Sequence, residues 1–395
     1  MSYDPENHLR FGAFFAPYNP IRGSASVQLR RGIDLAIHLD HMGFDEAWYG
    51  EHHSSGLEII PAPDVFIAAA AEHTRRIRFG TGVVSLPYHH PLIALDRICQ
   101  LDHQTNGRVI FGTGPGKLAI DSHMPGLDPR MQRTMQGESL KAITALLRGE
   151  VVTMKTDWFE LRDAQLHLFP YNQDGLEVCA ASTVSPSGSV LAGTYGLSML
   201  SLAAGDPAGF EALDSNWEIY EKESLDHGHV PSRRRWRLVA PMFLAETEEK
   251  AREAVRRNVL EIAYYIEKNY GKKFPWSESP EAAIDQWTTD GLPGFGKSVI
   301  GTPEQAIAHI ESLQRKSGGF GTFLINAHEL ASWEDTKNSF ELFAREVMPH
   351  FQGTNRGRIA SDQYMVDNAS WLSEGLAGAV QKAKDDYLGQ PAQPS

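Results

Sequence analysis

Apolar residues recur along the chain with two periods, one typical of buried strands and one typical of helices. A short apolar run, Leu9–Ala16, ends at two prolines and predicts a first strand. Between Val27 and Met42 the apolar residues return at close to helical spacing, and Gly43 follows where a helix C-cap is expected. A second strand is predicted at 43–48. The chain therefore begins as strand, helix, strand.

The same alternation continues to about residue 350. We expect further strands at 77–87, 108–112, 176–181, 196–202, 236–245 and 318–326. Helices are expected between them, at 64–71, 92–103, 135–147, 210–224, 247–270, 302–316 and 332–348, and a further helix is expected to begin at 185–189. Thr302, Pro303 and Gln305 carry the signature of a capped helix start. Roughly eight strand signals that alternate with helices indicate an α/β fold. They favour a (β/α)8 TIM barrel with insertions over an open sheet of five or six strands.

Three segments do not fit this alternation. Residues 151–170 predict a short β insertion that contains two neighbouring aromatic residues. Residues 271–299 are the least regular part, with scattered glycines and prolines, and are typical of either a mobile lid or a connector. We place the barrel domain at 1–353 and expect 354–395 to be a polar tail, partly helical over 369–387. The tail is assigned no chemistry.

Composition and charge limit the classes of function that the sequence allows. The chain has 395 residues, 42% of them hydrophobic, which is ample material for one elaborated domain or for two. The net charge of −13 argues against nucleic acid and anionic membranes as partners and favours a small ligand. Cys99 and Cys179 are too few for a disulfide scaffold or a zinc ribbon and fit a reducing, cytoplasmic setting. Neither a signal peptide nor an apolar segment of about 20 residues is evident, so no membrane association is expected.

A carboxylate and two imidazoles follow the second predicted strand. Glu51, His52 and His53 come directly after a run of aromatic and small residues that has no packing need for titratable rings. In closed barrels the loops after the strands carry the chemistry, and His is the side chain that titrates closest to neutral pH. We therefore take Glu51, His52 and His53 as catalytic candidates. The alternative is structural, with each ring hydrogen-bonded to a backbone carbonyl.

Two loops are candidates for binding a phosphate or a nucleotide. Ser185–Ser189 stands between a strand and a helix and offers free backbone N–H groups, so it predicts a phosphate site. Ordinary N-capping by one serine is the alternative. Gly112–Lys117 is a glycine-rich loop that lets a ligand approach the backbone, but its spacing fits neither a P-loop nor a dinucleotide fingerprint.

Metal and serine-nucleophile chemistry are disfavoured. Further histidines at 89, 90, 103 and 123 lack the spacing of a metal site, and no carboxylates stand at ligand spacing beside them. A Gly-x-Ser-x-Gly elbow does not follow any predicted strand. We therefore predict no metal and no acyl-enzyme chemistry.

These features together resemble the bacterial luciferase-like family of flavin-dependent monooxygenases. The matching motifs follow one another over most of residues 9–350: Phe11–Phe14, Gly43–Asp45, Glu51–His53, Gly80–Val83, Leu86–Pro87 with His90–Pro91, Leu101–Asp102 with Gly107–Arg108, and Gly301–Glu304. Four stretches, 48–54, 85–89, 154–159 and 184–188, look most like the limonene monooxygenase branch, with the diketocamphane monooxygenases as neighbours.

The resemblance implies a two-component enzyme. It would take reduced FMN from a separate flavin reductase and use O2 to oxygenate a small hydrophobic substrate, such as a monoterpene, through a flavin hydroperoxide. Epoxidation or hydroxylation is the favoured reaction, and Baeyer–Villiger oxygenation of a cyclic ketone is the alternative. A deazaflavin cofactor is less favoured, and a non-catalytic flavin-binding barrel is an alternative of another class. A homodimer formed through the first helices is also implied.

The resemblance further implies roles for residues near the second and third strands. By this likeness His52 is the catalytic imidazole, with Glu51 or His53 as the partner that orients it. Gly82 and Val83 are expected beneath the flavin ring, joined by a cis peptide bond that does not involve proline.

The same likeness places the cofactor phosphate in the serine-rich loop. The phosphate-binding residues it implies are Ser182, Ser187, Gly188 and Ser189, with Arg133 as the charged partner. Gly114 and Pro115 stand where the luciferase α chain has its reactive cysteine and a phosphate-binding arginine. Light emission is therefore not implied for this chain.

Overall fold

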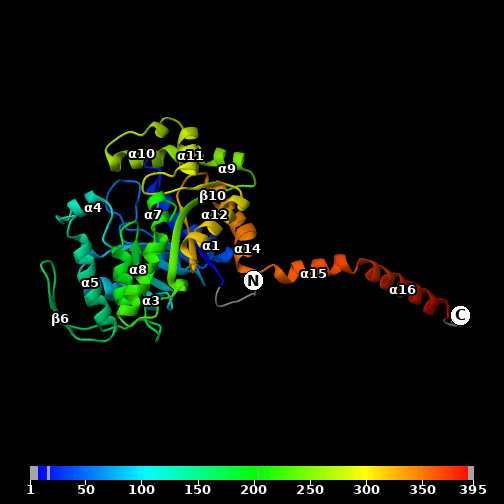
Figure 1. Cartoon of the computed structure of the whole chain (residues 1–395), viewed down its shortest axis with the longest axis horizontal. Coiled ribbons are helices and arrows are strands. Elements are labelled where there is room, and N and C mark those ends of the chain that lie inside the picture. Colours follow the sequence, from blue (N-terminus) through cyan, green and yellow to red (C-terminus); the bar gives the residue numbers. More distant parts are fainter. Residues whose placement is uncertain (1–7, 16–17, 203, 390–395) are drawn as a thin grey trace.

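The computed structural model describes residues 8–15, 18–202 and 204–389, and its main element is a closed ring of parallel strands surrounded by helices (Figure 1). The strands, in order around the ring, are β1 (Arg10–Phe15), β2 (Glu46–Tyr49), β3 (Arg78–Thr81), β5 (Val109–Gly114), β8 (Glu177–Ser182), β9 (Ser198–Ser201), β10 (Trp236–Leu244) and β12 (Thr322–Ala327). The ring closes because β12 pairs with β1 and β9 with β10. Two short strands, β4 (Val84–Ser85) and β11 (Val299–Gly301), pair with the carboxyl ends of β5 and β10. The predicted (β/α)8 barrel is confirmed.

Helices cover the outside of the ring. They are α1 (Ala25–Met42), α2 (Pro63–Ala71), α3 (Pro91–Gln104), α5 (Gln132–Leu147), α6 (Ser187–Tyr195), α7 (Pro207–Glu211), α8 (Leu213–Asp226), α12 (Pro303–Ser317), α13 (Trp333–Leu342) and α14 (Met348–Gln352). Two predicted caps are confirmed. Gly43 ends α1 with a φ of 86°, a left-handed conformation that glycine adopts freely. Thr302 and Gln305 form the capping box that begins α12.

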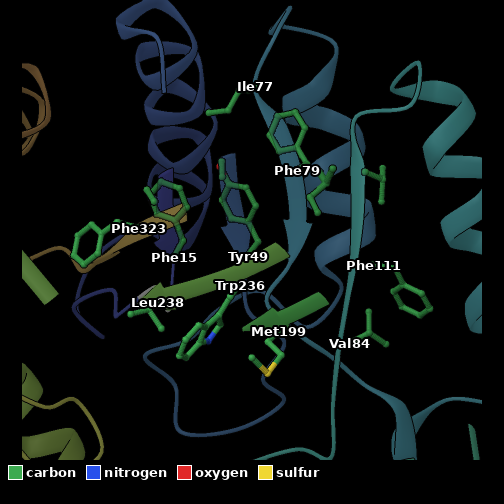
Figure 2. Packing of buried hydrophobic residues seen from close by; sticks show 14 of the residues in the cluster. Phe15, Tyr49, Ile77, Phe79, Val84, Phe111, Met199, Trp236, Leu238 and Phe323 are labelled. Carbon is green, nitrogen blue, oxygen red and sulfur yellow. The ribbon is translucent and has the colours of Figure 1, made fainter. Parts of the chain in front are cut away.

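Apolar side chains on the outer face of the strands pack against these helices (Figure 2). The rings of Phe15 and Tyr49 stack with their centroids 4.8 Å apart, and Tyr49 also lies 4.6 Å from the ring of Phe66 in α2. Figure 2 shows Phe79 and Phe111 continuing this layer on the next strands. The layer holds the helices on the barrel and leaves the strand ends free to carry loops.

The inside of the barrel has a separate core. Its buried residues are Phe14, Trp48, Ile110, Cys179, Leu200, Val239 and Leu324. Glycines make room for the indole of Trp48, since a Cβ atom at Gly80 would overlap the indole ring. A Cβ atom at Gly112 would overlap the carbonyl oxygen of Thr81 and approach the same indole. The lumen is therefore packed, and a ligand has room only beyond its ends.

Buried charges close the amino-terminal end of the barrel. Arg237, in β10, donates to both carboxylate oxygens of Glu46, at 2.7 and 2.9 Å, and to Glu177 at 2.9 Å. Glu46 also accepts from the indole N–H of Trp48 at 2.8 Å, and Arg78 contacts Glu177 at 2.9 Å. Burial disfavours the charged forms, yet the pairing wins: the pKa of Glu46 and of Glu177 is lowered and the pKa of Arg237 is raised.

The predicted single helix at 247–270 is wrong, because the structure has two helices there. Thr247 caps α9 (Glu248–Val255) as predicted, and α10 (Val259–Tyr270) follows after a break. At the break, Asn258 donates its side-chain N–H to the carbonyl oxygen of Glu329 at 2.8 Å. This tertiary contact fixes the chain between the two helices.

The segment 271–299 is more regular than expected. Ser279 caps α11 (Pro280–Thr289), in which Trp287 is fully buried. Pro280, one of the prolines that made this region look irregular, is the first residue of α11, a position that prolines favour. Helices α9, α10 and α11 share a core of their own and lie together across one end of the barrel (Figure 1).

Three further segments complete the described chain. Within 151–170, β6 (Val152–Lys155) and β7 (Glu160–Ala164) form a separate antiparallel pair. The predicted final helix at 332–348 includes a π-helical turn, Phe343–Val347, between α13 and α14. Beyond Gly353, α15 (Arg356–Asp367) and α16 (Ala369–Leu388) extend away from the barrel and have no buried residue (Figure 1). None of the described helices is long and apolar enough to cross a bilayer.

Candidate active site

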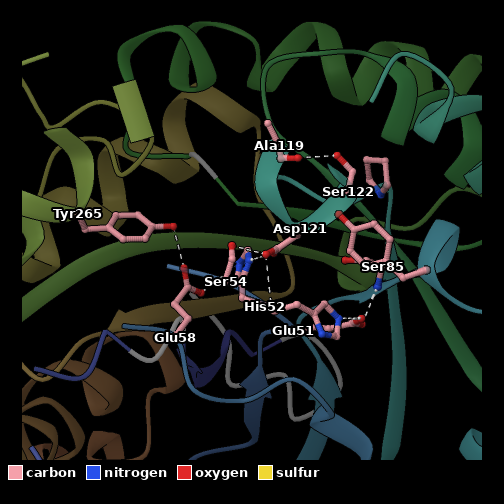
Figure 3. A network of polar contacts seen from close by, with 12 residues as sticks. Glu51, His52, Ser54, Glu58, Ser85, Ala119, Asp121, Ser122 and Tyr265 are labelled. Carbon is pink, nitrogen blue, oxygen red and sulfur yellow. Dashed lines mark hydrogen bonds and ion pairs between the residues drawn. The ribbon is translucent and has the colours of Figure 1, made fainter. Parts of the chain in front are cut away.

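The loop after β2 brings His52 to the carboxyl-terminal end of the barrel. Gly50 N–H donates to the carbonyl of Phe15 at 3.1 Å, and His52 N–H donates to the carbonyl of Ile60 at 3.2 Å. These backbone bonds fix the loop on both sides of Glu51. Figure 3 shows the polar side chains that gather around it.

The imidazole of His52 lies between two carboxylates. Its Nδ1 is 2.8 Å from Asp121, in the one-turn helix α4 (Ala119–His123), and its Nε2 is 3.1 Å from Glu58 (Figure 3). Burial alone would lower the pKa of His52, but Glu58 and the bond to Asp121 outweigh it, so the pKa is raised above 6.5. Burial pushes the pKa of Asp121 upward, but its bonds to His52 and Ser54 hold it below the usual value. The site therefore favours a charged imidazolium.

Each of these carboxylates has a further partner. Glu58 accepts from the phenol of Tyr265, in α10, at 2.8 Å. Tyr18 packs edge-on against Tyr265 with ring centroids 4.5 Å apart. Asp121 accepts from the hydroxyl of Ser54 and the backbone N–H of His53. These contacts fix both carboxylates in place, one on each side of the His52 ring.

Glu51 serves different partners from those the sequence predicted. Its carboxylate lies 2.9 Å from Nε2 of His53 and 2.8 Å from Nε2 of His89, and it accepts from the backbone N–H of Ser85 at 2.9 Å. The expectation that Glu51 or His53 orients His52 is wrong, because adjacent residues point apart and the His52 ring reaches α4 and residue 58. Burial raises the pKa of Glu51, but these bonds lower it overall; the pKa of His53 is raised, first by its bond to Glu51.

A cavity opens in front of His52 and encloses about 1300 Å³ of space that no atom fills, part of it continuous with solvent. Seven of the predicted site residues line it: Glu51, His52, Gly82, Val83, Arg133, Ser182 and Ser187. Apolar surface comes from Phe14, Val83, Leu202 and Phe295, and Lys117 extends into the cavity with its ammonium 6.0 Å from the Phe295 ring.

The serine-rich loop forms one side of this cavity. Helix α6 makes its first intrahelical bond at Val190, which donates to the carbonyl of Pro186, so the N–H groups of 187–189 precede the helical ladder. Gly188 lies so close to β8 that an added Cβ would overlap the carbonyl oxygen of Ala181. Ser189 is fully buried behind the loop. Neither Gly188 nor Ser189 is among the residues that line the cavity, and their role in phosphate binding stays a prediction.

The Gly82–Val83 peptide bond is cis, as the resemblance implied. Both residues line the cavity. They directly follow β3, which pairs with β2, the strand before the His52 loop. His53 and His89 lie beside the cavity and bond to Glu51 on its wall. In the described parts of the chain, His, Cys, Asp and Glu side chains form no group of three or more that could hold a metal ion.

Several residues of this site had no clear signal in the sequence. Glu58 is an isolated carboxylate in an apolar run, Asp121 lies in a short helix within a loop, and Tyr265 is 213 positions from His52 along the chain. An acidic residue between Leu57 and Ile59 was the one available signal, because a buried charge requires a partner.

Comparison with known proteins agrees with this geometry. The family model described as luciferase-like monooxygenase matches residues 9–319. The chain belongs to the luciferase-like monooxygenase family. It is 45% identical to limonene 1,2-monooxygenase of Rhodococcus erythropolis over 368 residues, 93% of each protein. It is 38% identical to 4-hydroxyprotoasukamycin monooxygenase of Streptomyces nodosus subsp. asukaensis, over 91% of this chain and 97% of that one.

Solved structures of the family share the barrel. The oxygenating constituent of 3,6-diketocamphane monooxygenase from Pseudomonas putida, a type II Baeyer–Villiger monooxygenase in complex with FMN, aligns with a TM-score of 0.70 and 26% identity, over 86% of this chain and 98% of that one. The coenzyme F420-dependent tetrahydromethanopterin reductase of Methanopyrus kandleri aligns with a TM-score of 0.64 at 19% identity, over 87% and 99% of the two chains, and shows the fold alone. The protein is a flavin-dependent monooxygenase, as the sequence predicted.

Proposed function

We propose that the protein is the oxygenase of a two-component, FMN-dependent system that acts on a small hydrophobic substrate of the monoterpene class. Reduced FMN would come from a separate flavin reductase, and O2 would supply the oxygen atom. The observation that carries this proposal is His52, held between Asp121 and Glu58 at the wall of a cavity. The names of its relatives, limonene 1,2-monooxygenase above all, support the substrate class.

The cavity residues fit FMN. Its phosphate requires backbone N–H donors and a cation, and the start of α6 offers N–H groups at Gly188 and Ser189 that precede the helical ladder, next to that of Ser187, which donates to the hydroxyl of Ser185. Arg133 and Ser182 line the same part of the cavity, and Arg133 makes no ion pair with any described residue. These residues would hold the phosphate, and Gly82 and Val83 would lie against the ring system. Bound reduced FMN supplies the electrons that activate O2 and transfers one oxygen atom to the substrate.

His52 would hold a proton where oxygen is transferred. With a carboxylate at each nitrogen, both N–H groups of the protonated ring can donate, and the raised pKa favours this charged form. A protonated oxygen donor is electrophilic and reacts with an alkene or a C–H bond. We therefore favour epoxidation or hydroxylation. Entry of a ligand would exchange the contact between Glu58 and the imidazole for one between the imidazole and the ligand.

Baeyer–Villiger oxygenation of a cyclic ketone is the second candidate. The similarity to the FMN complex of the diketocamphane enzyme favours it, and so does the 27% identity to the 3,6-diketocamphane 1,6-monooxygenase of Pseudomonas putida. That reaction needs a nucleophilic, deprotonated oxygen donor, for which a charged His52 is less suited. A deazaflavin in place of FMN is the less favoured cofactor. A homodimer through the first helices is part of the proposal.

One experiment separates these reactions. The protein is incubated with flavin reductase, NADH, FMN and either limonene or a camphor-type ketone, and the products are separated by gas chromatography. We expect an epoxide or an alcohol from limonene, and none without FMN. A lactone from the ketone with no oxygenated limonene would overturn the preference for epoxidation or hydroxylation. Static light scattering of the same preparation tests the homodimer.

A further inference from the structure

The floor of the cavity is made by the last inward-facing residues of the barrel strands. Alternate residues of a strand face opposite sides, so residues two positions apart face the same side. Phe14 is itself part of the lumen core, and most of the other floor residues lie two positions beyond a core residue of the same strand. The floor residues that line the cavity are Phe14, Gly50, Gly82, Ala181, Leu202 and Asn326. Five of these six are glycine or apolar. Asn326 is the exception, with a carboxamide.

Asn326 makes no hydrogen bond that would explain its place in the fold. Only 9% of the residue is exposed, and its side-chain oxygen Oδ1 is buried without a partner among the described residues. On β12 it is paired in register with Phe14 and Pro241, neither of which offers a polar side chain. A buried acceptor without a donor destabilises the fold, and native structures rarely retain one. An apolar residue would fill this position without that cost, so the carboxamide points to a ligand that enters the cavity.

The place of Asn326 in the barrel indicates which part of a ligand it meets. From Asn326 the order of strands leads through β1 to β2, which carries His52, in two steps. In the other direction it leads through β10 and β9 to β8, which ends at the serine-rich loop, in three steps. Asn326 therefore lies toward the reacting side of the cavity and away from the predicted phosphate site.

We propose that Asn326 recognises a hydrogen-bond donor and acceptor pair on the ligand held in front of His52. This proposal rests on the proposed function, which supplies two sources for such a pair. One is the imide N–H and C=O edge of the flavin ring, and the other is a hydroxyl group on the substrate. Either group satisfies Oδ1 with a donor and accepts from Nδ2 of the same amide. A purely hydrocarbon ligand would satisfy neither atom.

Two pairs of probes distinguish the sources, each pair differing by one donor. FMN is compared with 3-methyl-FMN, which lacks the imide N–H, by flavin fluorescence titration. Perillyl alcohol is compared with limonene, which lacks the hydroxyl, by titration calorimetry. The full-length protein is compared with Asn326→Leu, a variant of similar size, and with Leu202→Val, an apolar change in the same floor.

We expect the wild-type protein to bind the donor-bearing member of one pair at least tenfold more tightly, about the effect of one lost buried hydrogen bond. Asn326→Leu abolishes that preference, whereas Leu202→Val alters the affinities of both members alike. The pair that responds identifies the source. A preference that survives in Asn326→Leu, or none in the wild type, means that Asn326 holds water only and overturns the inference. Wild-type protein that binds no probe overturns the proposed function as well, while binding that ignores Asn326 overturns the inference alone.

Discussion

The two ends of the barrel both hold buried charges, yet they differ in what surrounds those charges. At the amino-terminal end Arg237 is fully buried, and its guanidinium is shared between Glu46 and Glu177. At the carboxyl-terminal end His52 is also shared between two carboxylates, Asp121 and Glu58, but it borders a cavity. The same arrangement of one cation between two carboxylates is enclosed at one end and accessible at the other.

This difference separates a structural site from a chemical one. An enclosed ion cluster can only stabilise or destabilise the fold, because no ligand reaches it. A titratable ring beside a cavity can exchange one of its partners for a ligand, and a raised pKa favours its charged form. Substitutions at the two ends should therefore have opposite signatures, one on folding and the other on turnover.

The largest effect is expected at the enclosed end. Arg237→Met leaves the carboxylate of Glu46 fully buried without its cation, whereas Glu177 keeps its contact with Arg78. Losing one partner of a buried pair costs about 3–5 kcal/mol of unfolding free energy. Urea unfolding followed by circular dichroism measures the loss. The matched control is Arg162→Met, which breaks an exposed pair with Glu160 and should leave the unfolding free energy nearly unchanged. Equal losses in the two variants would contradict the comparison.

The next largest effect is expected at the open end, on turnover. His52→Ala removes the proton donor and should lower the rate of product formation at least about tenfold, within the usual range for acid–base groups. FMN affinity should stay within a few-fold. Turnover equal to the wild type would remove His52 from the mechanism.

The barrel was predictable from the sequence because its signal is local and repeated. Each strand is a short apolar run and each helix has its own periodicity, so the eight units could be counted without knowing how they pack. Thr302 with Gln305, and Gly43, fixed helix ends through bonds within a few residues. The break near Asn258 was missed because it depends on the carbonyl of Glu329, which is distant along the chain.

The candidate site was predictable only in part, for the same reason. His52 follows its strand directly, and the rule that barrel chemistry lies after the strands identified it. Its partners Asp121 and Glu58 come from other loops, and their closeness to His52 arises only when the barrel closes. Proximity in sequence misled at Glu51, which is adjacent to His52 and yet bonds His53 and His89.

A smaller effect is expected when one carboxylate of the open end is neutralised. The pKa of His52 is raised above its ordinary value of 6.5. The pairing of His52 with Asp121 and Glu58 therefore stabilises the fold fully below pH 6.5, and this stabilisation is lost as the pH rises through the raised pKa. Glu58→Gln should lower the pKa of His52, and the alkaline fall in activity should move to lower pH with it. Imidazole NMR titration and a pH–rate profile measure both.

The control for this shift uses the neighbouring ring. Glu51→Gln removes the carboxylate that raises the pKa of His53, so it should lower the pKa of His53 and leave that of His52 nearly unchanged. If either variant moved both rings equally, the two histidines would share one electrostatic environment. The separate roles of Glu58 and Glu51 would then be wrong.

The smallest effect is expected from a change that touches neither end. Helices α15 and α16 have no buried residue, so a chain that ends at Gly353 loses no core contact of the barrel. Keeping Gln352 preserves its bond to the carbonyl of Leu9. The truncated protein should unfold within about 0.5 kcal/mol of the full chain and bind FMN with the same affinity, as expected when only exposed residues are removed. A loss above about 1 kcal/mol would mean that residues 354–395 belong to the barrel domain. It would also mean that the charge clusters at the two ends of the barrel are not the only groups outside the core that matter for folding.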